Sequence, residues 1–133
     1  MKKILLFAIV LLQINFASAQ LNMSLLSQFT FPGSRGDVSD IWGYVDENGN
    51  EYAIVGLQNG VAIVDVTNPT SPNEVFYTTG ANTIWRDMKT WGDKAYITNE
   101  GGNGMMIIDM SPLPGSTSLT VTNYTGSNYP FTT

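Results

Sequence analysis

The sequence of 133 residues contains no cysteine and no histidine. Without cysteine the chain can form no disulfide bond and has no thiolate chemistry. Without histidine it has no imidazole metal ligand and cannot build the usual Ser-His-Asp or Cys-His catalytic arrangements. Basic residues are also few, since six Lys and Arg stand against eleven Asp and Glu. The net charge of −5 therefore argues against a nucleic-acid partner, which requires a basic surface to contact phosphates.

The longest uninterrupted apolar run lies at the N-terminus, at residues 4–12, directly after two lysines. A membrane-spanning helix needs about 20 apolar residues, so this run is too short for one. The small residues Ala17-Ser18-Ala19 follow it and match a signal-peptidase cleavage pattern. We therefore predict a signal peptide at residues 1–19 and a secreted protein, located outside the cell or on its surface. Residues 20–38 would then form an N-terminal linker and strand.

The rest of the chain contains an internal repeat. The run VAIVDV at residues 61–66 aligns with MMIIDM at residues 105–110, about 44 positions later. Upstream, residues 52–60 can be laid over residues 95–104, with Tyr52 over Ala95, because both runs are apolar and enter a Gly/Asn turn. Self-similarity at a period of 40–45 residues is typical of propeller repeats.

Each copy reads as four short strands separated by turns rich in Asn, Gly and Pro. The middle two strands of each copy are almost entirely apolar, which indicates that both faces are buried. Ile63 and Ile107 are accordingly expected between blades. The fold class predicted is all-β, with two four-stranded antiparallel blades of a β-propeller; a β-sandwich is the alternative. The strands are expected at residues 40–45, 52–57, 61–66 and 74–79 in a blade spanning 39–80, and at residues 87–91, 94–99, 105–110 and 118–124 in a blade spanning 81–126.

Two blades do not close a propeller ring, which uses roughly 4–8 blades. We therefore expect a fragment of a longer protein, in which residues 127–133 begin the next blade. The alternative is that several copies of a short chain assemble into one ring. The apolar run at residues 23–31 is expected to add an outer strand to the last blade.

The run GVAIVDVTNP at residues 60–69 resembles the LVIVD repeat of bacterial surface propellers. Four further runs resemble the choice-of-anchor B family of secreted bacterial proteins: SDIWG at 39–43, EYAIVG at 51–56, WRDMK at 85–89 and NGM at 103–105. The resemblance implies an exported propeller with further blades and a C-terminal anchoring segment. It brings no established reaction, and the histidines that members often have in inner strands and loops are missing here.

The candidate ligand-binding residues lie at or beside the first strand of each copy. Two equivalent carboxylates there would contribute to a ring at one mouth of a propeller, suited to Ca²⁺ or a cationic ligand, or they bond turns and backbone amides instead. Exposed aromatic rings beside Arg and Asp can bind carbohydrate or peptide, or the rings wedge between blades. These candidates are Asp40, Trp42, Trp85, Arg86, Asp87 and Trp91.

Three other patterns point to structure rather than chemistry. Asp65 and Asp109 each end a third strand and are expected to stabilise the turn that follows. Residues 46–51, DENGNE, resemble part of a calcium loop, but position six is Glu51 and position twelve is Leu57, where an EF-hand needs Gly and Glu. They are expected to form a hairpin tip. Arg35-Gly36-Asp37 spells an adhesion tripeptide, which a linker explains equally well.

These observations predict a non-catalytic extracellular binding or scaffold module that holds a protein or glycan at one mouth of the ring. No cofactor is expected, because Ca²⁺ is not supported by a complete motif. Two alternatives stay open at this point: a secreted, hydrolase-like enzyme whose catalytic residues lie on further blades, and a structural spacer.

Overall fold

The structure is a computed structural model that describes residues 23–126. The signal peptide predicted at residues 1–19 and the expected start of a next blade at 127–133 lie outside the described residues. Within the described range, no helix is long and apolar enough to cross a membrane.

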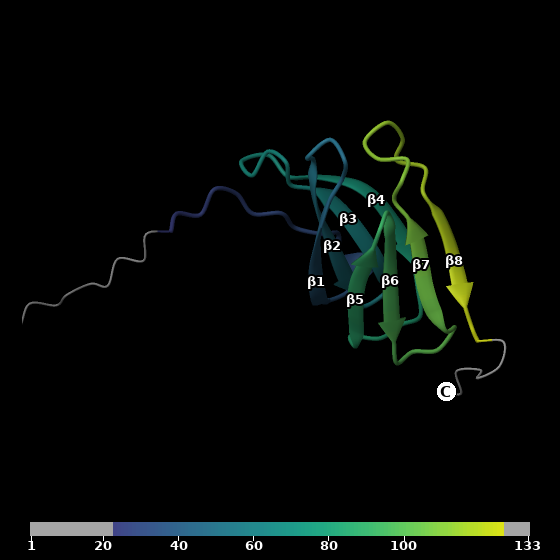
Figure 1. The fold of residues 1–133 in the computed structure, drawn as a ribbon. Coiled ribbons are helices and arrows are strands. Elements are labelled where there is room, and N and C mark those ends of the chain that lie inside the picture. The colour runs from purple at the N-terminus through teal and green to yellow at the C-terminus, as the bar shows by residue number, and fades with distance from the viewer. Residues whose placement is uncertain (1–22, 127–133) are drawn as a thin grey trace, which may run out of the picture.

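The described residues form two four-stranded antiparallel sheets and one short 3₁₀ turn, so the predicted all-β class is confirmed. Each sheet has its strands in chain order, joined by hairpins (Figure 1). Every predicted strand is present, with bounds within two residues of those expected. The elements are η1 (Gly33–Arg35), then β1 (Val38–Val45), β2 (Glu51–Leu57), β3 (Gly60–Asp65) and β4 (Asn73–Thr79) in the first sheet, and β5 (Arg86–Trp91), β6 (Lys94–Asn99), β7 (Met105–Asp109) and β8 (Thr120–Tyr124) in the second.

The strand register corrects one part of the repeat alignment. Ile63 pairs with Ile54 in the first sheet, and its counterpart Ile107 pairs with Tyr96 in the second. Ile54 therefore corresponds to Tyr96, and the alignment that laid Tyr52 over Ala95 is one residue out of register. A slip of one residue turns every side chain to the other face. The sequence could not reveal the slip, because β2 is apolar on both faces.

The two sheets pack face to face, with β1 beside β5 (Figure 1). Their shared core includes Ile54 and Ile63 from the first sheet and Met88 and Ile108 from the second, all at most 1% exposed. The Tyr44 hydroxyl crosses the same interface and donates a 2.9 Å hydrogen bond to Asp93 Oδ1. Close approach of the first strands of successive sheets is the arrangement of neighbouring propeller blades.

Ile107 differs from Ile63 in its burial. The side chain of Ile107 lies on the face of the second sheet that points away from the first sheet, and it is only half-buried. Its burial between blades requires a further sheet on that face and stays a prediction.

The outer face of the first sheet has its own apolar cluster, which includes Val55, Leu57 and Val64. Phe31 packs against this cluster from the N-terminal segment. The part of that segment which the structure describes, residues 23–32, forms no strand, so its predicted role in a last blade also stays a prediction.

Candidate functional site

The candidate site lies at the end of the sheets where β1 and β5 begin and where β2 and β6 end. Antiparallel pairing brings these termini together, because Arg86 at the start of β5 pairs with Asn99 at the end of β6. Two hollows open here, of about 510 and 340 Å³. Both are lined by Trp85 and Arg86, and we call them together the Trp85 hollows. The larger is completed by residues 37–40 and Ile84, and the smaller by Asp87, Thr98, Asn99 and Glu100.

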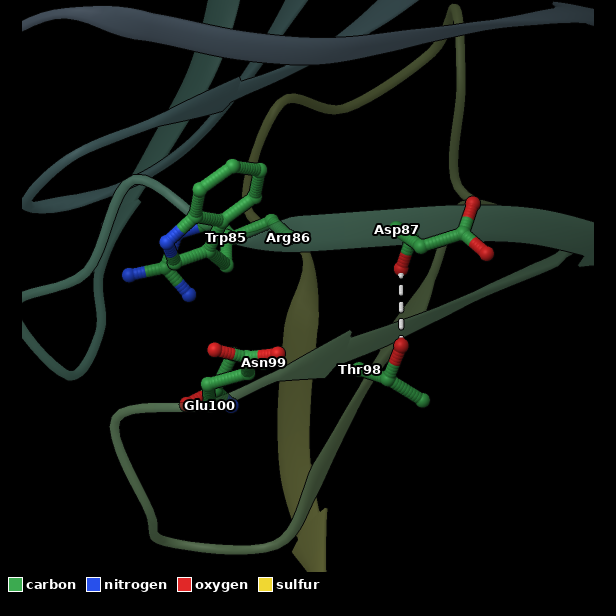
Figure 2. Close-up of a pocket in the computed structure, with 6 residues that line it drawn as sticks. All are labelled: Trp85, Arg86, Asp87, Thr98, Asn99 and Glu100. Carbon is green, nitrogen blue, oxygen red and sulfur yellow. Dashed lines mark hydrogen bonds between the residues drawn. The ribbon is translucent and has the colours of Figure 1, made fainter.

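Trp85 is the most exposed aromatic side chain of the Trp85 hollows, at 64%, and Ile84 beside it is 46% exposed. The backbone of this segment is fixed on both sides. The N–H of Trp85 donates to Thr83 Oγ1 at 3.1 Å, and its carbonyl accepts the N–H of Glu100 at 3.3 Å. Figure 2 shows Trp85 and Arg86 on one side of the smaller hollow, with Asn99 and Glu100 on the other. A rigid backbone therefore presents an apolar indole to solvent.

Arg86 points inward and is only 5% exposed. Its Nε donates to the carbonyl of Leu57 at 2.8 Å, and its Nη2 donates to the carbonyls of Gln58 and Ala81. Burial lowers the pKa of the Arg86 guanidinium below its usual value. Because Leu57 ends β2 and Gln58 lies in the turn that follows it, while Arg86 begins β5, the side chain connects the two sheets.

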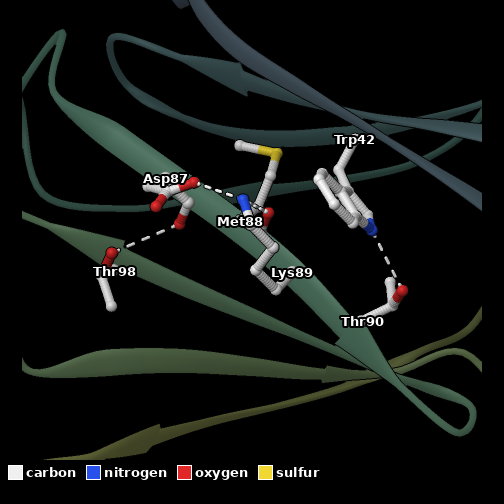
Figure 3. A network of polar contacts seen from close by, with 6 residues as sticks. All are labelled: Trp42, Asp87, Met88, Lys89, Thr90 and Thr98. Carbon is white, nitrogen blue, oxygen red and sulfur yellow. Dashed lines mark hydrogen bonds and ion pairs between the residues drawn. The ribbon is translucent and has the colours of Figure 1, made fainter.

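The two equivalent carboxylates, Asp40 and Asp87, lie near each other on β1 and β5. The pKa of Asp87 is lowered. The main causes are the 2.8 Å hydrogen bond that Lys89 Nζ donates to it and the positive charge of that ammonium. A side-chain hydrogen bond with Asp40 lowers the pKa of Asp87 by a smaller amount. The Thr98 hydroxyl donates to the carbonyl of Asp87 at 3.4 Å (Figure 3). Asp87 itself is exposed, so its carboxylate is ionised and open to a ligand at neutral pH.

Trp42 on β1 reaches across to β5 and remains 37% exposed. Its Nε1–H donates to Thr90 Oγ1 at 3.1 Å, and the ammonium of Lys89 lies 4.2 Å from its ring centroid (Figure 3). Trp91 is 80% exposed but lies at the opposite end of β5 from Trp85. The structure thus brings Asp40, Trp85, Arg86 and Asp87 together and leaves Trp91 apart.

Sequence reasoning missed Ile84, Thr98 and Glu100, which line the Trp85 hollows. Ile84 could have been found, because it is an apolar residue beside Trp85 in a segment outside any strand. Thr98 lies near the end of β6 and Glu100 directly follows that strand, so their place depends on a register that the sequence left open.

Asp65, Asp109 and the loop that contains Asp46 have the structural roles that were expected. Asp65 Oδ1 accepts the N–H of Thr67 at 2.9 Å, and Asp109 Oδ1 accepts that of Ser111 at 3.1 Å, so both close a turn. Burial alone would raise the pKa of Asp46, but hydrogen bonds from Asn50, Asn48 and Tyr52 lower it overall. Residues 46–50 accordingly form a closed hairpin tip.

The arginine of the Arg35-Gly36-Asp37 tripeptide is engaged within the fold. It forms an ion pair with Glu74, and its guanidinium lies 3.9 Å from the ring centroid of Tyr77. Among the described residues, no group of three or more Asp, Glu, His or Cys side chains could hold a metal ion.

Comparison with known families agrees with this division into two sheets. The family model described as LVIVD repeat matches residues 35–79 and 86–121. The chain belongs to the LVIVD repeat family. The first LVIVD match begins at the last residue of η1 and covers all of β1 to β4, and the second covers β5 to β7 and the start of β8. No curated protein and no solved structure matches the chain. The LVIVD repeat is a propeller-type repeat, and its two copies coincide with the two sheets.

Proposed function

We propose that this LVIVD repeat protein is a non-catalytic binding or scaffold module of an exported bacterial surface propeller of the choice-of-anchor B kind. Its ligand, an extracellular protein or glycan, contacts the Trp85 hollows. Further blades would complete the ring, with β1 and β5 on the side of the two sheets that faces its centre. The ligand lies at one mouth of that ring.

One observation supports this proposal above the others. An indole that is 64% exposed lies beside the exposed Ile84 and lines one hollow with Asp40 and the other with Asp87. Exposed aromatic and aliphatic side chains beside charged groups are the composition of binding surfaces, because the rings supply contact area and the charges supply direction. Both hollows open to solvent, which suits a chain-like ligand.

The binding proposal is tested by substituting, one at a time, Trp85, which directly precedes β5, and Trp91, which ends it. Ligands are first sought on arrays of glycans and of purified extracellular proteins. Affinity is then measured by calorimetry for the full chain, Trp85→Ala and the matched control Trp91→Ala. We expect Trp85→Ala to weaken binding by roughly tenfold or more, about 1.4 kcal/mol, and Trp91→Ala to leave it within about twofold. Equal loss in both variants, or no ligand on either array, contradicts the proposal.

Export has its own test. Mass spectrometry of the protein secreted by an expressing bacterium should find a mature N-terminus at Gln20, because the cleavage pattern ends at Ala19. Full-length protein retained in the cytoplasm would contradict the proposed location.

A further inference from the structure

Arg86 is the only charged side chain that is buried among residues 23–126. The three ion pairs in this part of the chain join other residues, so no carboxylate neutralises its charge. A buried cation without a counter-charge is costly, because hydration is lost and no opposite charge replaces it. Carbonyl dipoles compensate for only part of that loss.

The guanidinium also retains unused hydrogen-bond donors. Nε donates to Leu57, and Nη2 uses both of its hydrogens on Gln58 and Ala81. Nη1 has no hydrogen-bond partner in the described part of the chain. Two N–H groups of a buried cation are therefore available to an acceptor that comes from outside the protein.

A polar pocket of about 240 Å³ adjoins this end of Arg86. The contact lies at Gly80, where an added Cβ would be 3.2 Å from Nη1 and Nη2. Gly80 and Arg86 both line the pocket, and its lining contains no carboxylate. Its polar side chains are Thr79, Asn99, Asn103 and Asn123. We call it the Arg86 pocket.

The amides of the Arg86 pocket fall into two groups. Asn99 is fixed, because its Oδ1 accepts the N–H of Gly101 at 2.9 Å and its Nδ2 donates to the carbonyl of Gly104 at 3.1 Å. Asn103 and Asn123 are exposed, and their amides form no hydrogen bond within the described residues. Free amides both donate and accept, as the hydroxyl groups of a sugar require.

We propose that the Arg86 pocket binds the carboxylate of an acidic sugar, which accepts hydrogen bonds from Nη1 of Arg86 while Asn103 and Asn123 contact its hydroxyls. This inference rests on the proposed binding function and names the ligand class for the same end of the sheets, since Arg86 and Asn99 line both the Arg86 pocket and the smaller Trp85 hollow. A carboxylate is favoured over a neutral group because it supplies the missing counter-charge, and Arg–carboxylate hydrogen bonds are among the strongest.

The test compares two sugars that differ at one carbon. D-glucuronate has a carboxylate at C6 where D-glucose has a hydroxymethyl group. Binding of each to the full chain is measured by calorimetry and by NMR. We expect glucuronate to bind at least roughly tenfold more tightly than glucose, because only glucuronate neutralises Arg86.

Variants of β8 locate the site without disturbing the bonds of Arg86. Asn123→Asp places a negative charge in the lining of the Arg86 pocket, and Thr122→Asp places the same charge on the opposite face of β8. We expect Asn123→Asp to weaken glucuronate binding by roughly tenfold and Thr122→Asp to change it by less than about twofold. Far-UV circular dichroism confirms that both variants are folded.

Any one of the following results would overturn the inference: equal affinity for glucuronate and glucose, equal weakening by the two β8 variants, or no glucuronate binding at tens of millimolar. A ligand that is lost in Trp85→Ala but retained in Asn123→Asp would leave the proposed binding function in place and remove the acidic sugar from it. Binding of a peptide C-terminal carboxylate in preference to glucuronate would also reject the sugar.

Discussion

At the scale of single residues, Asp65 and Asp109 occupy equivalent positions but have different partners. Each accepts a backbone N–H in the turn after the third strand of its sheet. Only Asp109 has an additional lysine, whose Nζ donates to Oδ2 at 2.8 Å. The hydrogen bonds from Lys94 and Ser111 lower the pKa of Asp109 to about 2. A folded-state pKa below the unfolded value means that the ionised carboxylate stabilises the fold.

This difference predicts a pH dependence that belongs to Asp109. The ionised carboxylate of Asp109 contributes fully to the free energy of unfolding above its unfolded pKa, near 3.8. This contribution is lost as the pH falls towards about 2. Asp109→Asn keeps an oxygen for the turn and removes the charge. Urea unfolding at several pH values should therefore show parent and variant differing most near neutral pH and converging between about pH 4 and pH 2. Asp65→Asn is the matched control, because Asp65 closes the equivalent turn without an ion pair among the described residues. A constant difference for Asp109→Asn across this range would contradict the assignment.

Arg86 and Trp85 show what the sequence could and could not predict about the site. Both were expected to contact a ligand, because a tryptophan, an arginine and Asp87 stand in a row. Alternation along an extended backbone turns neighbouring side chains to opposite sides, so one of them had to face the first sheet. The path of residues 80–85 decides which one, and no local pattern fixes that path. Arg86 is the residue that faces inward, and this placement creates the Arg86 pocket.

At the scale of the strands, the positions of the elements could be predicted and one register could not. Turns that contain Asn-Gly or Pro mark where the strands begin and end. Gly and Asn tolerate backbone angles that other residues avoid, and Pro has a fixed one. The pairing of β6 with β7 depends on which face of each strand is buried. Since β2 is apolar on both faces, the alignment of Tyr52 with Ala95 fitted as well as the true register.

Two glycines in strands of the first sheet test the packing of its backbone. A Cβ at Gly60, the first residue of β3, would lie 2.1 Å from the carbonyl oxygen of Thr78, whereas a Cβ at Gly43 in β1 would meet no atom within 4 Å. We expect Gly60→Ala to lower the free energy of unfolding by about 3 kcal/mol, because backbone must move. Gly43→Ala should change it by less than about 0.5 kcal/mol. Urea denaturation measures both, and equal values would show that β3 and β4 are spaced more widely than described.

At the scale of the whole molecule, the two sheets share one core and should unfold together. Ile63 belongs to the first sheet, yet it is fully buried in the cluster that contains Met88, Ile97 and Ile108 of the second. A cooperative unit of this size unfolds in one transition when its parts depend on the same buried contacts. Sheets that were each stable alone would instead unfold in two steps.

Ile63→Asp and Ile107→Asp distinguish these cases. An unpaired carboxylate at Ile63 would lie between the sheets and cost several kcal/mol, so we expect both sheets to be lost. Ile107 is half-buried on the far face of the second sheet, and its aspartate can remain hydrated. Ile107→Asp should therefore cost about 1 kcal/mol and leave a folded protein. Far-UV circular dichroism reports all eight strands, and hydrogen exchange of the backbone amides of β6 reports the second sheet. Retention of native protection of the β6 amides in Ile63→Asp would mean that the second sheet folds without the first, and the shared core would not be what holds the two repeats together.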